Sequence, residues 1–398
     1  MREVVVVDGV RTAIGRMGGT LKSVEPDYLA AHVMKELLER NQFDGNDVDH
    51  VILGHVKQST EQPNIARKAA LRAEIPIEVP AYTVHRQCGS GLQSINNAAQ
   101  EIMSGLGEVI VAGGVESMSS APYYIRGARF GLQAGNSVIV DPNTESQPKA
   151  QPEEVYGHHL TMGLTAENLA EQYDISRTEQ DEFALRSQEL AKLAIERGEF
   201  KDEITPFEVK ERKQTILFQE DEHPRATNLE KLGKLNAVFK QGGTVTAGNS
   251  SGRNDAAAAT LVMSKEEAER RGLQPKLRVV AQASAGVRPD YMGIGPVPST
   301  HKALKQAGLT LDDIDLIELN EAFAAQALSV VKELGADLNR VNVNGGAIAL
   351  GHPLGATCNI LTIKLMNEMK VRGSRYGLVT ACIGGGLGIT TIFENLQV

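Results

Sequence analysis

The chain has 398 residues, of which 41% are hydrophobic and 23% are charged, and its formal net charge is −9. This is ordinary globular composition, and the length predicts two or more domains with a sizeable core. An acidic chain without a Lys- or Arg-rich run argues against a nucleic-acid partner, and no apolar stretch reaches the roughly 20 residues that span a membrane. Three cysteines without paired spacing are typical of a reducing compartment, so we expect a cytoplasmic protein.

The first 121 residues alternate short apolar runs with helical patterns. Strands are expected at residues 4–7, 51–53, 79–84 and 109–112, helices at 28–40, 65–73 and 92–102, and a Gly-rich loop at 11–20. Such alternation predicts parallel strands that are joined by crossover helices.

The alternation breaks after residue 121. The following sequence predicts a Gly- and Pro-rich stretch at 131–156, helices at 165–173 and 177–198, a solvated charged run at 208–225 and a returning strand at 257–263. Ser176 is suited to cap the second of these helices. We therefore interpret residues 122–248 as an inserted loop domain.

A second alternating series follows, and it resembles the first. Strands are expected at 277–283, 316–319, 376–381 and 388–393, and helices at 301–307, 322–334 and 357–369. Residues 47–54 resemble 313–320, and 108–116 resemble 377–385, at an offset of about 265 residues, which indicates a duplicated domain. We predict an N-terminal half, 1–121 plus 249–272, and a C-terminal half, 273–398.

Cys88 lies between a predicted strand and a predicted helix. Unpaired backbone N–H groups and the helix dipole at such a place favour the thiolate and lower the thiol pKa. Gly89 and Gly91 would allow a tight turn and close approach of a substrate. For a lone cysteine, the alternative is a buried and inert side chain.

Three stretches of the C-terminal half carry further candidate residues. They are Asn320 to Phe323 after a strand, the Gly- and Ala-rich run that leads to His352, and the Gly-rich turn at whose tip we expect Cys382. The repeat offset relates Cys88 to His352, and such a pair can act as a nucleophile with its base. A second thiol with a pKa near 8 suits general acid–base work on a carbon acid.

Taken in order, these motifs resemble the thiolase family, which contains the acetyl-CoA acetyltransferases and the 3-ketoacyl-CoA thiolases. The resemblance runs over essentially the whole chain and rests on Arg11-Thr12 with Gly15 and on residues 64–67, 88–91, 113–119, 246–252, 320–323, 351–353 and 382–386. It implies a fold of duplicated α/β domains that form a layered αβαβα core, with an inserted loop domain.

The resemblance also implies a role for each candidate residue. Cys88 would take the acyl group, and His352 would accept its proton and polarise the thioester oxygen. Asn320 would hold a water in that oxyanion site. Cys382 would remove the α-proton of the second acetyl-CoA, or return it in thiolysis. The N–H groups of Cys88 and Gly384 would form a second oxyanion hole, and the kinetics would be ping-pong.

Acetyl-CoA, 3-ketoacyl-CoA and CoA are the substrates that the resemblance implies, without a cofactor or a metal. The side chains and backbone expected along them belong to Met162, Arg225, Ala247, Gly248, Ser251 and Phe323, with Arg225 at the nucleotide end. A homodimer or homotetramer is implied, and residues 130–141 are candidates for the tetramer contact.

Two positions depart from the family pattern. His85 stands where the family usually has Asn, and it either tunes the Cys88 pKa or is a buried, satisfied side chain. Thr161 stands where short-chain members carry a His, which leaves open a preference for acetoacetyl-CoA or for longer 3-ketoacyl-CoA substrates of a degradative enzyme. The competing functions are a β-ketoacyl carrier-protein synthase, a Cys–His thioester hydrolase and a non-catalytic acyl-CoA-binding or lipid-binding protein.

Four other side chains have plainer interpretations. Cys358 is expected to be a core thiol, and His158 and His159 are expected on a surface loop rather than on a metal. Glu321 either caps the helix that follows it or orients groups around Asn320.

Overall fold

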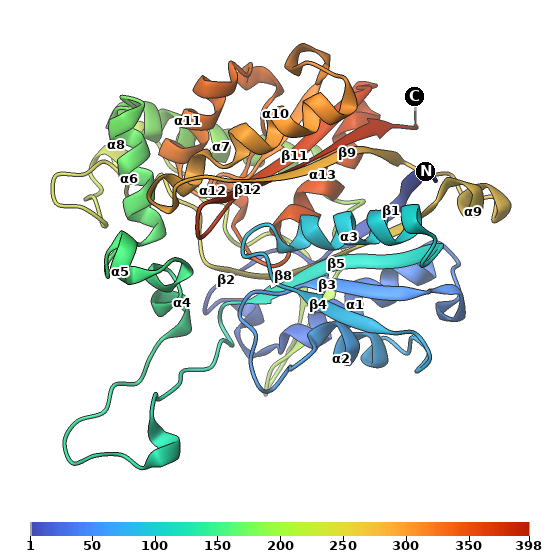
Figure 1. The fold of residues 1–398 in the computed structure, drawn as a ribbon, viewed down its shortest axis with the longest axis horizontal. Helices are drawn as coiled ribbons and strands as arrows, with labels where there is room; N and C mark the ends of the chain where they lie inside the picture. Colours follow the sequence, from blue (N-terminus) through green and yellow to red (C-terminus); the bar gives the residue numbers. More distant parts are fainter. Residues whose placement is uncertain (1, 398) are drawn as a thin grey trace.

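The computed structural model describes residues 2–397, and its main feature is one ten-stranded mixed sheet (Figure 1). The strands are β1 (Val4–Arg11), β2 (Gly15–Arg16), β3 (His50–Gly54), β4 (Ala81–Val84), β5 (Val109–Ser117), β8 (Asn254–Ser264), β9 (Leu277–Gly286), β10 (Leu316–Leu319), β11 (Tyr376–Ile383) and β12 (Leu387–Asn395). Their order is β10-β11-β12-β9-β1-β8-β5-β3-β4, with β2 beside β8. The two halves join where Val5 and Val6 of β1 pair with β9.

Helices form three layers around the two halves of this sheet. Two cover the outer face of the N-terminal half, two lie between the halves, and two cover the outer face of the C-terminal half. In that order the pairs are α1 (Pro26–Arg40) with α2 (Ile65–Arg72), α3 (Ser90–Ser104) with α13 (Thr357–Arg372), and α10 (Pro296–Ala307) with α11 (Ala324–Leu334). The layered αβαβα core that the resemblance implied is therefore confirmed.

The two central helices hold the molecule together. α3 carries Leu92, Ile95 and Ile102 at helical spacing, and all three are fully buried. α13 is buried on nearly all sides, as expected for a helix that packs between the two halves of the sheet. Each buried aliphatic side chain of this kind contributes roughly 1.5–3 kcal/mol of transfer free energy.

The internal repeat is visible in matching hydrogen bonds. The carboxylate of Asp49 accepts the backbone N–H groups of Glu108 and Val109 at the start of β5. The carboxylate of Asp315 accepts those of Arg375 and Tyr376 at the start of β11. An aspartate at the equivalent position therefore fixes the equivalent parallel strand pair in each half, β3–β5 in the first and β10–β11 in the second.

Residues 122–248 contain most of the structure outside these layers. Their elements are α4 (Pro142–Glu145), α5 (Glu153–Tyr156), α6 (Met162–Gln172), α7 (Arg177–Arg197), the hairpin β6 (Phe207–Lys210) and β7 (Thr215–Phe218), and α8 (Leu229–Gly233). Ser176 and Glu179 form a reciprocal capping box at the start of α7, as the sequence indicated. The remaining α-helices of residues 2–397 are α9 (Lys265–Arg270) and α12 (Ala347–Leu350).

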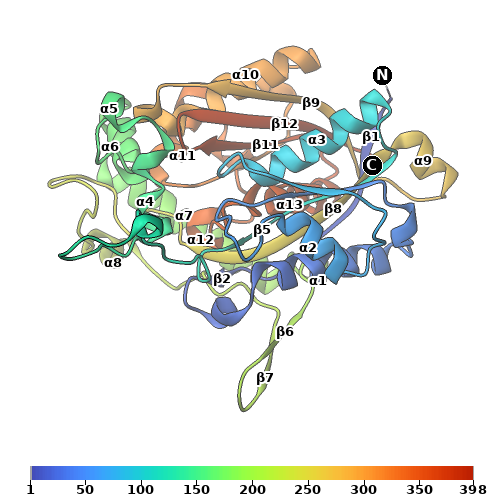
Figure 2. The same cartoon turned by 60° about the horizontal axis from the view of Figure 1, so that its bottom comes forward.

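Two segments of this region project from the body. The exposed arm, residues 122–140, extends at the bottom of Figure 1, and the β6–β7 hairpin extends at the bottom of Figure 2. The prediction that residues 208–225 form a solvated surface holds for the tip of this hairpin but is wrong for Val209 and Phe218, which are buried. The carboxylate of Asp221, in the same run, is buried against Arg11 at 2.8 Å.

Several predicted boundaries shift for identifiable reasons. β1 continues to Arg11, because Asp8 and Arg11 are buried among polar partners and the strand is longer than its apolar run. α10 begins at Pro296, a residue that is favoured in the first turn of a helix. In residues 2–397 no helix is long and apolar enough to cross a membrane.

Candidate active site

The candidate catalytic residues come together from four separate elements. Cys88, His352, Cys382 and Gly384 line one cavity of about 190 Å³. Cys88 precedes α3, His352 precedes α13, and Cys382 and Gly384 lie at the end of β11. Asn320, directly after β10, lies behind His352. The two central helices of the duplicated core therefore direct the Cys88 and His352 loops toward one point.

Cys88 has a different resting state from the one that the sequence predicted. Burial raises the pKa of its thiol to about 11, whereas the helix-terminus argument predicted a lowered pKa. The backbone N–H groups of Gly384 and Cys88 itself favour the thiolate but do not outweigh burial. α3 begins only at Ser90, so the helix end does not dominate at the sulfur. Cys88 is therefore a neutral thiol before substrate binds.

The glycines next to Cys88 are required for packing within the protein and not for contact with a substrate. A Cβ atom on Gly91 would lie 2.9 Å from the Asn359 nitrogen and from the Gly355 oxygen. A Cβ atom on Gly89 would lie 2.6 Å from the Ile383 side chain. The expectation that these glycines admit a substrate is therefore corrected: they let α3 pack tightly against the C-terminal half.

His352 is fixed as one tautomer by its neighbours. Its Nδ1 lies 2.7 Å from the Thr357 hydroxyl, which itself donates to the Pro353 carbonyl over 2.9 Å. The hydroxyl can therefore only accept from the ring, so Nδ1 carries the proton and Nε2 is an acceptor. Burial lowers the pKa of His352 to about 4, which keeps the ring neutral. An imidazole in this state is ready to take a proton at Nε2.

Asn320 contacts the acceptor atom of His352. Its Nδ2 lies 3.4 Å from His352 Nε2, and its residue is fully buried. Its Oδ1 has no hydrogen-bond partner among the residues that the structure describes. Because a buried amide oxygen is normally satisfied, this side chain is suited to hold a further donor, such as a water, beside His352.

Cys382 lies in β11 and not at the tip of the turn, as the sequence suggested. The turn consists of the glycines that follow it, and Gly385 and Gly386 have φ of 90° and 85°. Cys382 is 1% exposed, and burial raises the pKa of its thiol well above the ordinary value. The expected pKa near 8 is therefore wrong for the free protein, and Cys382 is protonated at rest.

The residues expected along a CoA thioester divide into two groups. Met162, Ser251 and Phe323 line the Cys88 cavity. Arg225, Ala247 and Gly248 do not line it, although the Arg225 guanidinium donates to the Ala247 carbonyl over 3.0 Å. The Ser251 N–H donates to the Ala322 carbonyl, which fixes this segment against the start of α11.

The residues that departed from the family pattern lie outside the cavity. His85 is exposed, so the interpretation as a buried, satisfied side chain is wrong. Thr161 accepts the Leu164 N–H as the N-cap of α6, next to Met162. His158 and His159 are exposed, as expected, and among residues 2–397 no cluster of His, Cys, Asp and Glu side chains could hold a metal ion.

Glu321 and Cys358 are buried next to the candidate catalytic residues and do not line the cavity. Glu321 does not cap α11, which begins at Ala324; its carboxylate accepts from the Asn342 amide, the Ser187 hydroxyl and the Ile348 N–H. These bonds hold the segment that leads to His352, whereas the orienting role was expected around Asn320. Cys358 is a buried core thiol, as expected.

Sequence reasoning missed four residues around the site. Thr357 fixes the His352 ring, and Asn254 accepts the His352 N–H over 2.9 Å. Glu116 is fully buried and accepts the N–H groups of Val56, Lys57 and Gly355. Lys57 lines the cavity. An acid within an apolar strand was a usable signal for Glu116, whereas nothing local marks Lys57.

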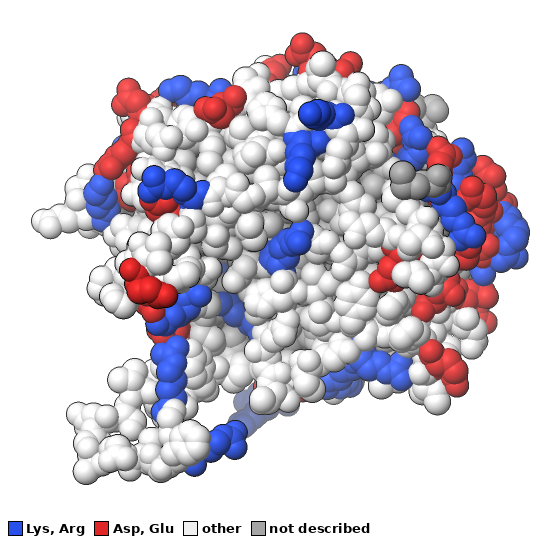
Figure 3. All heavy atoms as spheres, in the orientation of Figure 1, with Lys and Arg blue, Asp and Glu red and all other residues white. Residues whose placement is uncertain are grey.

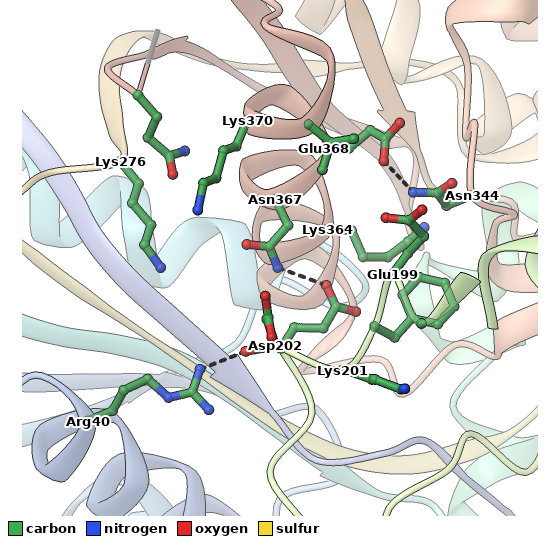
Figure 4. Close-up of a pocket in the computed structure, with 15 residues that line it drawn as sticks. Arg40, Glu199, Lys201, Asp202, Lys276, Asn344, Lys364, Asn367, Glu368 and Lys370 are labelled. Atoms are coloured by element: carbon green, nitrogen blue, oxygen red, sulfur yellow. Dashed lines mark hydrogen bonds between the residues drawn. The ribbon is translucent and has the colours of Figure 1, made fainter. Parts of the chain in front are cut away.

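A larger cavity, of about 630 Å³, contains none of these residues. Figure 4 shows that charged side chains of both signs surround it, among them Arg40, Lys276, Lys370 and Asp202. Asn344 binds Glu368 there, and Arg40 donates to the Asp202 backbone carbonyl. It offers neither a thiol nor an imidazole, so its size does not make it the reaction site.

The chain is similar to known proteins over its whole length. It matches the family descriptions "Thiolase, N-terminal domain" over residues 4–266 and "Thiolase, C-terminal domain" over residues 273–395. It is 51% identical over 398 residues to the beta-ketothiolase BktB of Cupriavidus necator, covering 99% of this chain and 100% of that protein. It is 49% identical over 399 residues to the acetyl-CoA acetyltransferase of Syntrophomonas wolfei, covering 99% of this chain and 100% of that one.

Two solved structures share the fold closely. The Bacillus anthracis acetyl-CoA acetyltransferase superposes with a TM-score of 0.97 at 48% identity, covering 100% of this chain and 99% of that one. The human mitochondrial 3-ketoacyl-CoA thiolase in complex with CoA superposes with a TM-score of 0.93 at 45% identity, covering 99% of this chain and 98% of that one.

Proposed function

Because the chain belongs to the thiolase family and is an acyltransferase, we propose that Cys88 carries the acyl group between CoA thioesters. In one direction two acetyl-CoA molecules give acetoacetyl-CoA and CoA. In the other, CoA cleaves a 3-ketoacyl-CoA. The observation that carries this proposal is the meeting of two thiols and one neutral imidazole at a single cavity.

The first half-reaction uses Cys88 and His352. Since Cys88 has a pKa of about 11 and His352 a pKa of about 4, both are neutral at rest. The proton therefore moves to His352 Nε2 as the sulfur attacks the thioester carbonyl, and the imidazolium then stabilises the developing oxyanion. CoA leaves as its thiol after taking the proton of Cys382, and the acyl group stays on Cys88.

In the second half-reaction, Cys382 is the group that removes or returns the α-proton of acetyl-CoA. In condensation the Cys382 thiol first gives its proton to the leaving CoA thiolate, and the resulting Cys382 thiolate removes the α-proton of the second acetyl-CoA. The carbanion attacks the acyl-Cys88 carbonyl, and the Cys88 thiolate that leaves recovers its proton from the His352 imidazolium. In thiolysis the protonated thiol returns the proton to the departing acetyl-CoA carbanion. Its raised pKa supports the protonated state that thiolysis requires.

Each attack on a thioester needs its own group of donors for the oxyanion. The N–H groups of Cys88 and Gly384, which already favour a negative sulfur, are suited to the acyl-enzyme. The unpartnered Asn320 Oδ1 and the neighbouring His352 support the second, water-assisted site. Loss of one such donor typically costs about 10²–10³ in rate.

We include the CoA contacts, the lack of a cofactor and the cytoplasmic location in the proposal. Met162, Ser251 and Phe323 would line the pantetheine and acyl groups, because they line the cavity. Arg225 would meet the nucleotide end, where the Ala247 carbonyl holds its exposed guanidinium. The domain limits 1–121 plus 249–272, 122–248 and 273–398 remain part of the same proposal.

Self-association is also part of the proposal. β4 is the outer strand of its half and pairs only with β3 among the described strands, and such an edge favours pairing with another chain. In Figure 3 the charged side chains lie mainly along the edges of the face, among them the region of α9, while the middle is mostly uncharged apart from a few basic side chains. These features support a homodimer, and the exposed arm supports a homotetramer.

The direct test is CoA-dependent cleavage of acetoacetyl-CoA, 3-ketohexanoyl-CoA and 3-ketooctanoyl-CoA by the wild type and Cys88→Ala. We expect cleavage by the wild type and its loss in the variant. The relative cleavage rates of the three substrates decide whether Thr161 is compatible with a short-chain enzyme. No cleavage of any of them by the wild type would point instead to an acyl-CoA-binding protein.

Cys382→Ala separates a thiolase from a Cys–His thioester hydrolase. We expect the variant to form acyl-Cys88 from acetyl-CoA, which mass spectrometry of the intact protein detects. Its condensation and thiolysis rates should fall by about 10²–10⁴, the usual worth of a general acid–base group. A hydrolase would keep its turnover in this variant.

A further inference from the structure

The Cys88 cavity has an unbalanced charge. Two cationic side chains, Lys57 and Arg253, line it, and no carboxylate does. The whole chain, in contrast, carries a net charge of −9. The positive charge is therefore a local property of the reaction site.

Lys57 is held in place but not neutralised by an ion pair. Its Nζ donates to the Ser146 hydroxyl over 2.6 Å and to the Pro142 carbonyl over 3.1 Å. An ammonium group has three N–H donors, so one remains for a further acceptor. Among residues 2–397 no carboxylate oxygen lies within ion-pair distance of Nζ.

The acidic groups nearest to Lys57 are occupied elsewhere. Glu116 accepts three backbone N–H groups and lies beside His55. Asp141 accepts the N–H of Asn143 and the hydroxyl of Thr144. Burial lowers the pKa of Lys57, which reflects the cost of keeping an ammonium in this half-buried place.

Arg253 reinforces the charge on the same cavity. Its side chain is partly buried, and among the described residues its guanidinium makes no hydrogen bond or ion pair. A guanidinium is charged at every physiological pH and prefers carboxylate or phosphate partners. The cavity thus has a second cation that is available to an anionic ligand.

We propose that the acyl pocket accepts 3-ketoacyl chains that end in a carboxylate, with Lys57 as the specificity-determining contact. This inference rests on the proposed thiolase function. Thiolysis would leave an ω-carboxyacyl group on Cys88 and release acetyl-CoA, and CoA would then take the acyl group, while the carboxylate itself does not react. An alkyl chain end would instead dehydrate the ammonium without replacing its lost hydrogen bonds.

The test compares substrates of equal length that differ only in the terminal carboxylate. We would measure kcat/KM for 3-oxoadipyl-CoA against 3-ketohexanoyl-CoA, and for 3-oxosuberyl-CoA against 3-ketooctanoyl-CoA. The wild type should prefer the carboxylate in at least one pair by about 10- to 100-fold, the usual worth of a charge-assisted hydrogen bond. Lys57→Met should lower that ratio to near one, whereas Ser146→Ala, which keeps the charge, should retain most of it.

Three results would overturn the inference. The wild type could show no preference in either pair, which needs no variant to observe. Lys57→Met could keep the preference. Lys57→Met could also raise KM equally for both substrates of a pair, which would mean that the Lys57 ammonium contacts the CoA part of the substrate and not the chain end. If the wild type cleaves neither these substrates nor acetoacetyl-CoA, the thiolase proposal fails; cleavage of acetoacetyl-CoA alone rejects only the carboxylate proposal.

Discussion

The Cys358 thiol donates a hydrogen bond to the Cys88 backbone carbonyl over 3.2 Å. A side chain of α13, in the C-terminal half, therefore fixes the backbone of the candidate nucleophile in the N-terminal half. Burial raises the pKa of Cys358 well above that of a free thiol, so it stays a donor at any physiological pH. The two cysteines thus differ in chemistry although they are in contact.

This difference predicts how the free protein reacts with iodoacetamide. The thiolate is the reacting form, and the pKa of Cys88 is about 11, so the labelling rate should rise about tenfold per pH unit between pH 7 and pH 10. Peptide mass spectrometry should find Cys88 alkylated long before Cys358 and Cys382. A plateau near pH 8 would contradict burial as the dominant influence and would restore the helix-terminus argument.

Labelling of two variants separates the three thiols. Cys88→Ser should remove the fast phase, and Cys358→Ala should retain it. If Cys358→Ala abolished the fast phase instead, the fast-reacting group would be Cys358, and the assignment of its buried donor role would be wrong.

Arg11 should make a large contribution to stability. Its fully buried guanidinium binds Glu203 at 2.7 Å and Asp221 at 2.8 Å. Arg11→Met leaves two carboxylates buried without their partner, so the free energy of unfolding should fall by about 3–5 kcal/mol in urea titrations. Lys192→Met, which removes an exposed pair with Glu196 on α7, is the control and should leave the urea midpoint unchanged. Equal midpoints for the two variants would refute this account.

The exposed arm should control the size of the assembly. Phe130 is 89% exposed and Val138 is 76% exposed in the single chain, which is unusual for apolar side chains of this size. The double variant Phe130→Ser, Val138→Ser should lower the mass measured by light scattering after gel filtration. Leu217→Ser on the β6–β7 hairpin is the matched control, because Leu217 is 53% exposed on the other projecting segment. A mass that falls only in the control would move the contact to the hairpin.

The parts of this molecule that the sequence predicted depend on local patterns. The spacing of Leu92, Ile95 and Ile102 was enough for α3, and the glycine-flanked motifs were enough to select Cys88, His352 and Cys382. The family resemblance then supplied the layer order. Each of these signals is contained within a short segment, so no knowledge of distant contacts was needed.

The parts that the sequence did not predict depend on distant contacts. The pKa of Cys88 follows from burial, and the groups that act on its thiol include Lys57, Glu116 and Gly384, none of which adjoins it in sequence. Asp221 looked solvated because its partner, Arg11, is 210 residues away. Lys57 has no local signal, since its importance comes from the cavity that residues 142–146 and the C-terminal half complete around it.

The tautomer of His352 gives the last prediction. Thr357→Val keeps the shape of the side chain but removes the only acceptor that the structure gives to Nδ1–H. A ring without this partner can rotate or place its proton on Nε2, where it cannot take the Cys88 proton. We therefore expect kcat for acetoacetyl-CoA thiolysis to fall about tenfold, the worth of one hydrogen bond, with little change in KM. Thr362→Val is the matched control, because the Thr362 hydroxyl donates to the Cys358 carbonyl over 2.9 Å on the same helix and does not touch His352. Equal losses in kcat would show that the effect comes from packing of α13, whereas a loss confined to Thr357→Val would mean that the hydroxyl selects the catalytic tautomer.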